Sequence, residues 1–158
     1  MPGEASSSGP TARTGRGTRP ACWLIYGIVW FEEPLPPDDL EGYIALTKVS
    51  PVPIAGGEVL TPRQAFQPWI ERRAVDIIQP DCTKNGGPSE SRRIAWLAYD
   101  HNVQVVPHGW NTAVGLAADL QFSAAIPVAR YVEYLTPCVY TLTRLPPNRF
   151  VLMMKACS

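Results

Sequence analysis

The chain has 158 residues, of which 46% are apolar and 18% are charged, and this supplies enough apolar material for the core of one domain. Its 14 basic and 14 acidic residues balance, so it lacks the basic excess that nucleic-acid and membrane-surface partners require. Its apolar runs are also far shorter than the roughly 20 residues of a membrane-spanning helix, so we do not expect a protein with transmembrane helices.

Residues 1–21 differ in composition from the rest of the chain. They are rich in Ser, Thr, Gly and Arg and contain almost no apolar side chains. Such a segment cannot bury enough surface to offset the entropy of ordering. We interpret it as a disordered or non-native leader, followed by one domain over residues 22–137.

The first half of the domain alternates between strand and helix patterns. An apolar stretch predicts a strand over residues 28–31, and Pro36-Pro37-Asp38-Asp39 then opens a helix. A second strand ends at Gly56-Gly57-Glu58. The next helix is predicted to start at Thr61-Pro62, with Thr61 as its N-cap, and Pro68 should kink or split it. The expected inward side chains of the two helices are Leu40, Tyr43, Ile44 and Thr47, then Ala65, Phe66, Trp69 and Ile70.

The second half continues the same alternation. A nearly unbroken apolar run over residues 74–79 is typical of a strand buried on both faces. After the turn at residues 85–88 we expect a helix from Ser89, with Ile94, Leu97 and Ala98 inward and Trp96 in the core. The further elements are a strand over 103–106, a helix over 112–125 and a strand over 130–135, before an irregular tail at 138–158. The inward face of the 112–125 helix is predicted to be Ala113, Leu116, Ala117, Leu120 and Ala124.

Each of the five predicted strands ends in an ionisable side chain. These endpoints recur about every 25 residues, which is the length of a βα unit. In a parallel barrel all strand ends open on one face, so the five side chains should converge on one site. We therefore predict an α/β fold, a partial TIM-like (β/α) barrel, since five units are too few to close eight strands. The five endpoints are Glu32, Glu58, Asp81, His108 and Glu133.

Glu32 and Glu58 are candidate metal ligands. Two carboxylates at neighbouring strand ends can share a divalent cation, most naturally Mg²⁺. The alternative is that both are solvated loop residues, as glutamates often are. Glycines directly before Glu58 favour tight backbone geometry and hence the ligand interpretation.

Asp81 and His108 are candidate catalytic residues. An aspartate behind a histidine at the adjacent strand end would fix the tautomer of His108 for acid–base work. The alternative for His108 is a purely structural loop histidine. His101, at a helix end, is interpreted as a residue without a catalytic role. Lys84 is either a local charge partner of Asp81 or a surface lysine, and Glu133 either bonds a substrate oxygen or is simply exposed. The four cysteines lack the paired spacing of a zinc or redox site, which favours reduced thiols in a cytoplasmic protein.

Five motifs together resemble the enolase superfamily, in particular its mandelate racemase/muconate lactonizing enzyme subgroup and the sugar-acid dehydratase-like members. In order they are WFEEP from Trp30, AGGE from Ala55, DIIQPDCTKNGG from Asp76, PHGWNTAVG from Pro107 and YVEY from Tyr131. The resemblance spans about residues 26–137 and implies strands four to eight of an enolase-type barrel.

The resemblance also implies a reaction. Glu32 and Glu58 match Mg²⁺ ligands, Asp81 and His108 match an Asp–His dyad, and Glu133 matches a carboxyl that bonds the substrate's carboxylate. The implied chemistry is abstraction of the proton α to a carboxylate. Loss of a β-hydroxyl would then convert a sugar acid to a 2-keto-3-deoxy acid. A racemase or epimerase, or a cycloisomerase, would use the same dyad.

The chain departs from the family at its N-terminal side. The family's first metal ligand is an aspartate on the third strand, but no aspartate precedes Asp38 here, and the Lys-x-Lys motif of the second strand has no counterpart before Lys48. We therefore expect the isolated chain to be incomplete and inactive. Because open sheet edges associate, a homo-oligomer is expected, and a non-catalytic half-barrel that oligomerises is the alternative of another class.

Overall fold

The computed structural model describes residues 27–110 and 112–134. The leader expected at residues 1–21 and the irregular tail expected at 138–158 lie outside the described residues.

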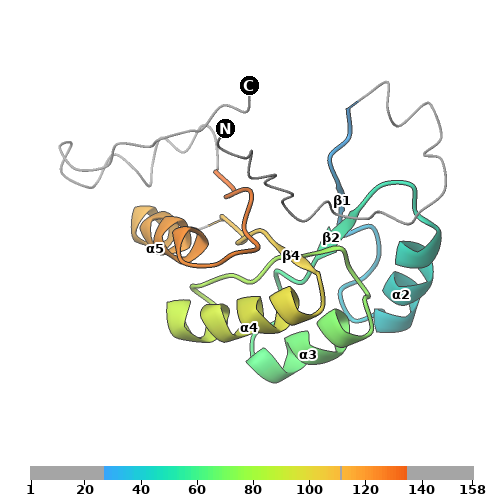
Figure 1. Ribbon diagram of the computed structural model, residues 1–158, viewed down its shortest axis with the longest axis horizontal. Helices are drawn as coiled ribbons and strands as arrows, with labels where there is room; N and C mark the ends of the chain where they lie inside the picture. Colours follow the sequence, from blue (N-terminus) through green and yellow to red (C-terminus); the bar gives the residue numbers. More distant parts are fainter. Residues whose placement is uncertain (1–26, 111, 135–158) are drawn as a thin grey trace, which may run out of the picture.

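Strands and helices alternate along the described chain (Figure 1). The four strands form one parallel sheet in the order β1-β2-β3-β4, and the helices between them follow one another around one side of it. This arrangement confirms the prediction of an α/β fold made of successive βα units. In chain order the elements are β1 (Phe31–Glu32), α2 (Leu40–Val49), β2 (Ile54–Gly56), α3 (Arg63–Glu71), β3 (Ile77–Ile78), α4 (Pro88–Asp100), β4 (Gln104–Val105) and α5 (Ala113–Ala124).

Helix α2 starts as its sequence predicts. Asp39 is the N-cap, and its Oδ1 accepts a hydrogen bond from the backbone N–H of Gly42 at 2.9 Å. Such a bond satisfies one of the backbone donors that a helix start leaves unpaired. Tyr43, Ile44 and Thr47 are buried as predicted, and the Thr47 hydroxyl donates to the carbonyl of Ala74 at 2.6 Å.

The start of α3 differs from the prediction, and of the two effects expected at Pro68 the split does not occur. Pro62, not Thr61, is the N-cap, and no side chain caps this helix. Pro68 lies inside the helix without splitting it. Phe66, Trp69 and Ile70 pack into the core, and their burial offsets the cost of about 3 kcal/mol that a proline imposes inside a helix.

The strand predicted over residues 130–135 is wrong for the part that is described. Residues 130–134 are irregular, and only Ala129 makes an isolated parallel bridge, to Val105 of β4. Glu133 instead packs against Gly109, where an added Cβ would lie 2.6 Å from the Glu133 carbonyl oxygen. The segment therefore crosses the loop after β4 rather than extending beside the strand.

The inward face of α5 and the position of Trp96 are further corrections. The buried residues of α5 are Ala113, Gly115, Asp119 and Phe122, so its face is rotated from the predicted small-residue stripe. Trp96 of α4 is 43% exposed and stacks edge-on against Tyr99, whereas Ile94 of the same helix is fully buried. Apolar character alone gave the wrong inward face for α5 and the wrong position for Trp96. The rotation of each helix about its own axis decides which side chains face the sheet.

The main core lies between the sheet and its helices. Its largest fully buried members include Tyr43, Phe66, Ile70 and Ile94. No helix within the described residues is long and apolar enough to cross a bilayer.

The contrast within α4 gives a stability prediction. Ile94→Ala should lower the free energy of unfolding by about 2–5 kcal/mol, because it leaves a cavity in the core. Trp96→Ala, on the exposed side of the same helix, should cost clearly less. Urea unfolding of both variants checks this, and an equal loss would place Trp96 in the core after all.

Candidate functional site

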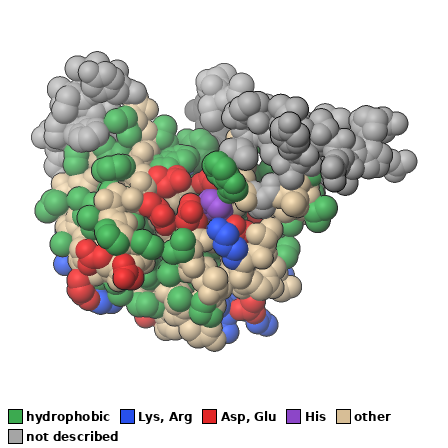
Figure 2. Space-filling view, turned by 180° about the vertical axis from the view of Figure 1, so that it is seen from behind, with side chains coloured by type: hydrophobic (Ala, Val, Ile, Leu, Met, Phe, Trp, Pro, Cys, Tyr) green, Lys and Arg blue, Asp and Glu red, His purple; other side chains and the backbone are tan. Residues whose placement is uncertain are grey.

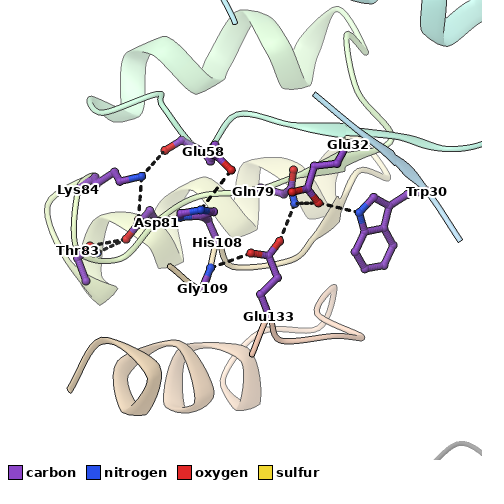
Figure 3. Close-up of polar contacts among 10 residues, drawn as sticks. All are labelled: Trp30, Glu32, Glu58, Gln79, Asp81, Thr83, Lys84, His108, Gly109 and Glu133. Atoms are coloured by element: carbon purple, nitrogen blue, oxygen red, sulfur yellow. Dashed lines mark hydrogen bonds and ion pairs between the residues drawn. The ribbon is translucent and has the colours of Figure 1, made fainter. Parts of the chain in front are cut away.

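The structure brings all five predicted site residues to the carboxyl end of the sheet. Figure 3 shows Glu32, Glu58, Asp81, His108 and Glu133 linked through short polar contacts, some direct and some through neighbours. The expected convergence is therefore observed.

Asp81 and His108 form a buried pair. His108 Nδ1 lies 2.9 Å from Asp81 Oδ2, with Asp81 0% and His108 7% exposed. The other carboxylate oxygen of Asp81 accepts from the backbone N–H and hydroxyl of Thr83 at 2.7 and 2.6 Å. Lys84 Nζ lies 3.2 Å from Asp81 Oδ2, so Lys84 is its local charge partner, the first of the two alternatives. These donors hold the carboxylate in one orientation behind the imidazole.

The surroundings of Asp81 favour its ionised form. Burial by itself raises the pKa of Asp81, but hydrogen bonds from Thr83, His108 and Lys84 together hold it below its usual value. Because an ionised carboxylate only accepts hydrogen bonds, the facing His108 Nδ1 must carry the proton. The second ring nitrogen, Nε2, is then the one that can exchange protons with other groups.

His108 Nε2 faces the carboxylate of Glu58. Its distance to Glu58 Oε2 is 3.2 Å, and the backbone carbonyl of Glu58 lies 3.4 Å from Lys84 Nζ. The imidazole is thus placed between two carboxylates, one at each nitrogen.

Gln79 joins the other two predicted residues. Its Nε2 donates to Glu32 Oε2 at 2.8 Å and to Glu133 Oε1 at 2.7 Å. The second oxygen of Glu133 accepts from the backbone N–H of Gly109 at 2.8 Å. Burial, and then the charge of Glu32, raise the pKa of Glu133, while the bonds from Gly109 and Gln79 oppose this.

The residues beside Glu32 complete this end of the site. Trp30 Nε1 donates to Glu32 Oε2 at 2.9 Å, and the Trp30 ring lies 5.5 Å from that of Tyr131. Glu33 has a left-handed backbone (φ 39°), and its Oε1 is buried without a hydrogen-bond partner among the described residues. Burial, followed by the charge of Glu58, raises the pKa of Glu33.

Sequence reasoning missed Gln79, Thr83 and Trp30 as members of the site. Gln79 could have been found from strand alternation, because it lies two residues before Asp81 and so shares its face of the chain. Thr83 carries the local signal of a hydroxyl two residues after an aspartate, which is typical of an Asx-type turn. For Trp30, no signal in the sequence indicates that its ring N–H reaches Glu32.

The fit of the site to a divalent cation is partial. Glu32 and Glu58 offer the carboxylate oxygens that Mg²⁺ prefers. Within residues 27–110 and 112–134, however, no group of three or more His, Cys, Asp or Glu side chains could hold a metal ion. The donor type therefore fits, while the described ligand set is incomplete.

Acidic side chains dominate this face. Figure 2 shows Asp and Glu side chains gathered around a histidine, with a basic side chain beside it. Clustered negative charges make the local electrostatic potential more negative, which attracts cations. The arrangement can hold a positive ion or cationic group and can move a proton at the histidine.

Comparison with known proteins gives consistent matches. The sequence model of the family described as "Enolase C-terminal domain-like" matches residues 18–153. The D-galactarolactone cycloisomerase of Agrobacterium fabrum is 46% identical over 101 residues, covering 64% of this chain and 27% of that protein. The D-xylonate dehydratase of Haloferax volcanii is 36% identical over 109 residues, covering 69% of this chain and 26% of that protein.

Solved structures agree with the sequence matches. The 3,6-anhydro-D-galactonate cycloisomerase of Zobellia galactanivorans has a TM-score of 0.66 at 36% identity, covering 71% of this chain and 32% of that one. An enolase of Agrobacterium radiobacter, bound to sodium and L-malate, has a TM-score of 0.65 at 37% identity, covering 68% and 27%. The chain spans about a quarter of the length of the curated relatives it matches.

The lowered pKa of Asp81 predicts the acid stability of the chain. Its stabilising contribution is present above its unfolded pKa, near 3.8, and is lost as the pH falls through the still lower folded value. Asp81→Asn should cost about 1–3 kcal/mol at neutral pH, because it places an amide where a buried carboxylate accepts hydrogen bonds. The difference from the wild type should shrink as the pH falls below about 4 in chemical unfolding. A difference that is constant with pH would contradict this origin.

Proposed function

The chain belongs to the enolase C-terminal domain-like family, and we propose that its site abstracts the proton α to the carboxylate of a sugar acid, in a dehydration that yields a 2-keto-3-deoxy acid. The single observation that carries this proposal is the buried Asp81–His108 pair, with Nδ1 held at 2.9 Å and Nε2 directed at the acidic end of the site. The dehydratases among the relatives support the reaction type.

In this mechanism His108 is the acid–base group. Asp81 accepts from Nδ1–H throughout, which keeps the lone pair of the neutral imidazole on Nε2. His108 takes the α-proton at Nε2 when the Glu58 oxygen that now lies 3.2 Å away is engaged elsewhere. The same imidazole can return the proton to the β-hydroxyl, which leaves as water while the remaining enol becomes the 2-keto group.

Glu133 would bind the substrate carboxylate. Burial, and then the charge of Glu32, raise the pKa of Glu133, which eases uptake of the proton that this carboxylate needs to donate a hydrogen bond to another carboxylate. Gly109 and Gln79 hold its two oxygens in place beside His108.

Magnesium is part of the proposal. Glu32 and Glu58 would hold it, together with a ligand from outside the described residues. When bound, Mg²⁺ would supply the positive charge that stabilises an ionised substrate carboxylate as its α-proton leaves.

A cycloisomerase is the second candidate. The relative with 46% identity is a D-galactarolactone cycloisomerase, and such a reaction would use the same proton transfer at His108. Product analysis separates the two, because a dehydratase releases a 2-keto-3-deoxy acid and a cycloisomerase does not lose water. A racemase or epimerase would instead return the proton to the α-carbon.

We also propose that the chain forms a homo-oligomer. β1 ends the order of strands, and both of its residues are exposed, so its outer edge can pair with another chain. A half-barrel that oligomerises without catalysis would keep its assembly when Glu32 and Glu58 are both replaced by alanine.

For the whole enzyme, we predict that His108→Asn slows exchange of the substrate α-proton with solvent deuterium by about 10²–10⁴-fold. His101→Asn is the matched control, because the His101 ring contacts the Leu97 carbonyl at the C-terminal end of α4 and none of the five predicted site residues within the described chain. Proton NMR of a sugar acid in D₂O measures both rates. Exchange at the wild-type rate in His108→Asn would rule out His108 as the base.

The adjacent pair Glu32 and Glu33 gives a prediction for cation binding. Glu32→Gln and Glu33→Gln each remove one negative charge. We expect only Glu32→Gln to lower Mg²⁺ affinity about tenfold or more, because losing a direct ligand weakens binding more than losing a nearby charge does. Calorimetric titration with MgCl₂ compares them. Equal losses would mean that Glu33, with its buried carboxyl oxygen, is the ligand or shares that role.

A further inference from the structure

We propose that Gln79 is a positioning residue that sets the separation and orientation of Glu32 and Glu133. The roles of these two carboxylates, in holding the cation and the substrate, rest on the proposed function. The bridge itself rests on geometry alone.

One amide nitrogen carries both contacts. Gln79 Nε2 lies 2.8 Å from Glu32 Oε2 and 2.7 Å from Glu133 Oε1, so its two N–H groups go to two different carboxylates (Figure 3). The three residues come from β1, the end of β3 and the segment after Ala129, which are far apart in sequence. Gln79 is thus a direct link between distant parts of the site.

The orientation of the amide follows from its neighbours. A flipped amide would place Oε1 against two carboxylate oxygens, which repel it, so only the donor orientation is stable. In that orientation Oε1 is buried and has no hydrogen-bond partner among the described residues. Leaving a buried acceptor without a partner is unfavourable, and the two bonds to carboxylates offset this cost.

The neutrality of Gln79 suits this position. The carboxylates of Glu32 and Glu133 both lie within hydrogen-bond distance of the same nitrogen, so their ionised forms repel each other. A lysine here would hold both groups but cancel a charge that the cation needs. An amide donates two hydrogen bonds without changing the net charge of the site.

Each carboxylate has a second fixed point. Trp30 Nε1 also donates to Glu32 Oε2, and the Gly109 backbone N–H donates to Glu133 Oε2. With Gln79 removed, each carboxylate keeps one protein donor and can rotate about it. The chain would fold, but the two groups would lose their fixed spacing.

The test replaces the amide and keeps the bulk. Gln79→Met in the whole protein should lower Mg²⁺ affinity by about 10–100-fold, as loss of the groups that orient a ligand does elsewhere, and should raise KM for the sugar acid. Gln67→Met is the matched control, because Gln67 Nε2 also donates to a carboxylate, that of Glu71 at 2.7 Å, on the exposed side of α3. If Gln79→Met does not fold, Gln79→Asn retains an amide that is too short to span both carboxylates.

The outcomes separate this inference from the proposed function. Wild-type Mg²⁺ affinity and KM in a folded Gln79→Met or Gln79→Asn, with only a change in unfolding temperature, would overturn the positioning role. If the wild type neither binds Mg²⁺ nor exchanges an α-proton, the proposed function fails, and the bridge is then judged by the side-chain amide NMR signals of Gln79. Glu32→Gln and Glu133→Gln should each shift these signals, and signals unmoved by both substitutions would overturn the inference.

Discussion

The parallel register of β3 with β4 is the constraint on which the site depends. Ile78 pairs with Val105, and Asp81 and His108 each lie three residues beyond these partners. Strands that run side by side in the same direction therefore deliver the two side chains together, and the 2.9 Å bond follows from the equal offset. The backbone N–H of His108 also donates to the carbonyl of Pro80 at 3.2 Å, which extends the pairing beyond the strands. A shift of one residue would point one of the two side chains away.

The second physical problem of the site is the concentration of negative charge. Glu32, Glu33, Glu58, Asp81 and Glu133 lie at one end of one small sheet, which is costly unless donors accompany them. The structure supplies these donors one by one: Thr83 and Lys84 for Asp81, Gln79 for Glu32 and Glu133, and the backbone of Gly109 for Glu133. The donors do not balance everywhere, as the raised pKa values of Glu33 and Glu133 show, both caused first by burial. Raised pKa values of this kind are typical of sites that bind a cation or transfer a proton.

The sequence was sufficient for the fold class, the family and the convergence of Glu32, Glu58, Asp81 and His108, because the repeat of apolar strand and ionisable residue is local information. Glu133 joins them although the segment that carries it is irregular. It was insufficient wherever the outcome depends on how elements pack. Phe122 and Asp119 are buried in α5 in place of the predicted stripe, and Trp96 faces solvent, because the rotation of a helix against the sheet is a tertiary property. The irregular path of residues 130–134 is set by the approach to Gly109, which no local pattern encodes. Strand alternation places Gln79 on the face of Asp81, but its bridge depends on two partners that lie 47 and 54 residues away, which no local pattern encodes.

Asp81 holds His108 in one tautomer, and the ¹⁵N NMR signals of the His108 ring near neutral pH test this. We expect a protonated Nδ1, since the ionised Asp81 carboxylate at 2.9 Å can only accept a hydrogen bond. The signal of Nδ1 should become sensitive to pH or move when Asp81 is replaced by asparagine. An unprotonated Nδ1, with the proton on Nε2 alone, would show that Asp81 does not fix the tautomer.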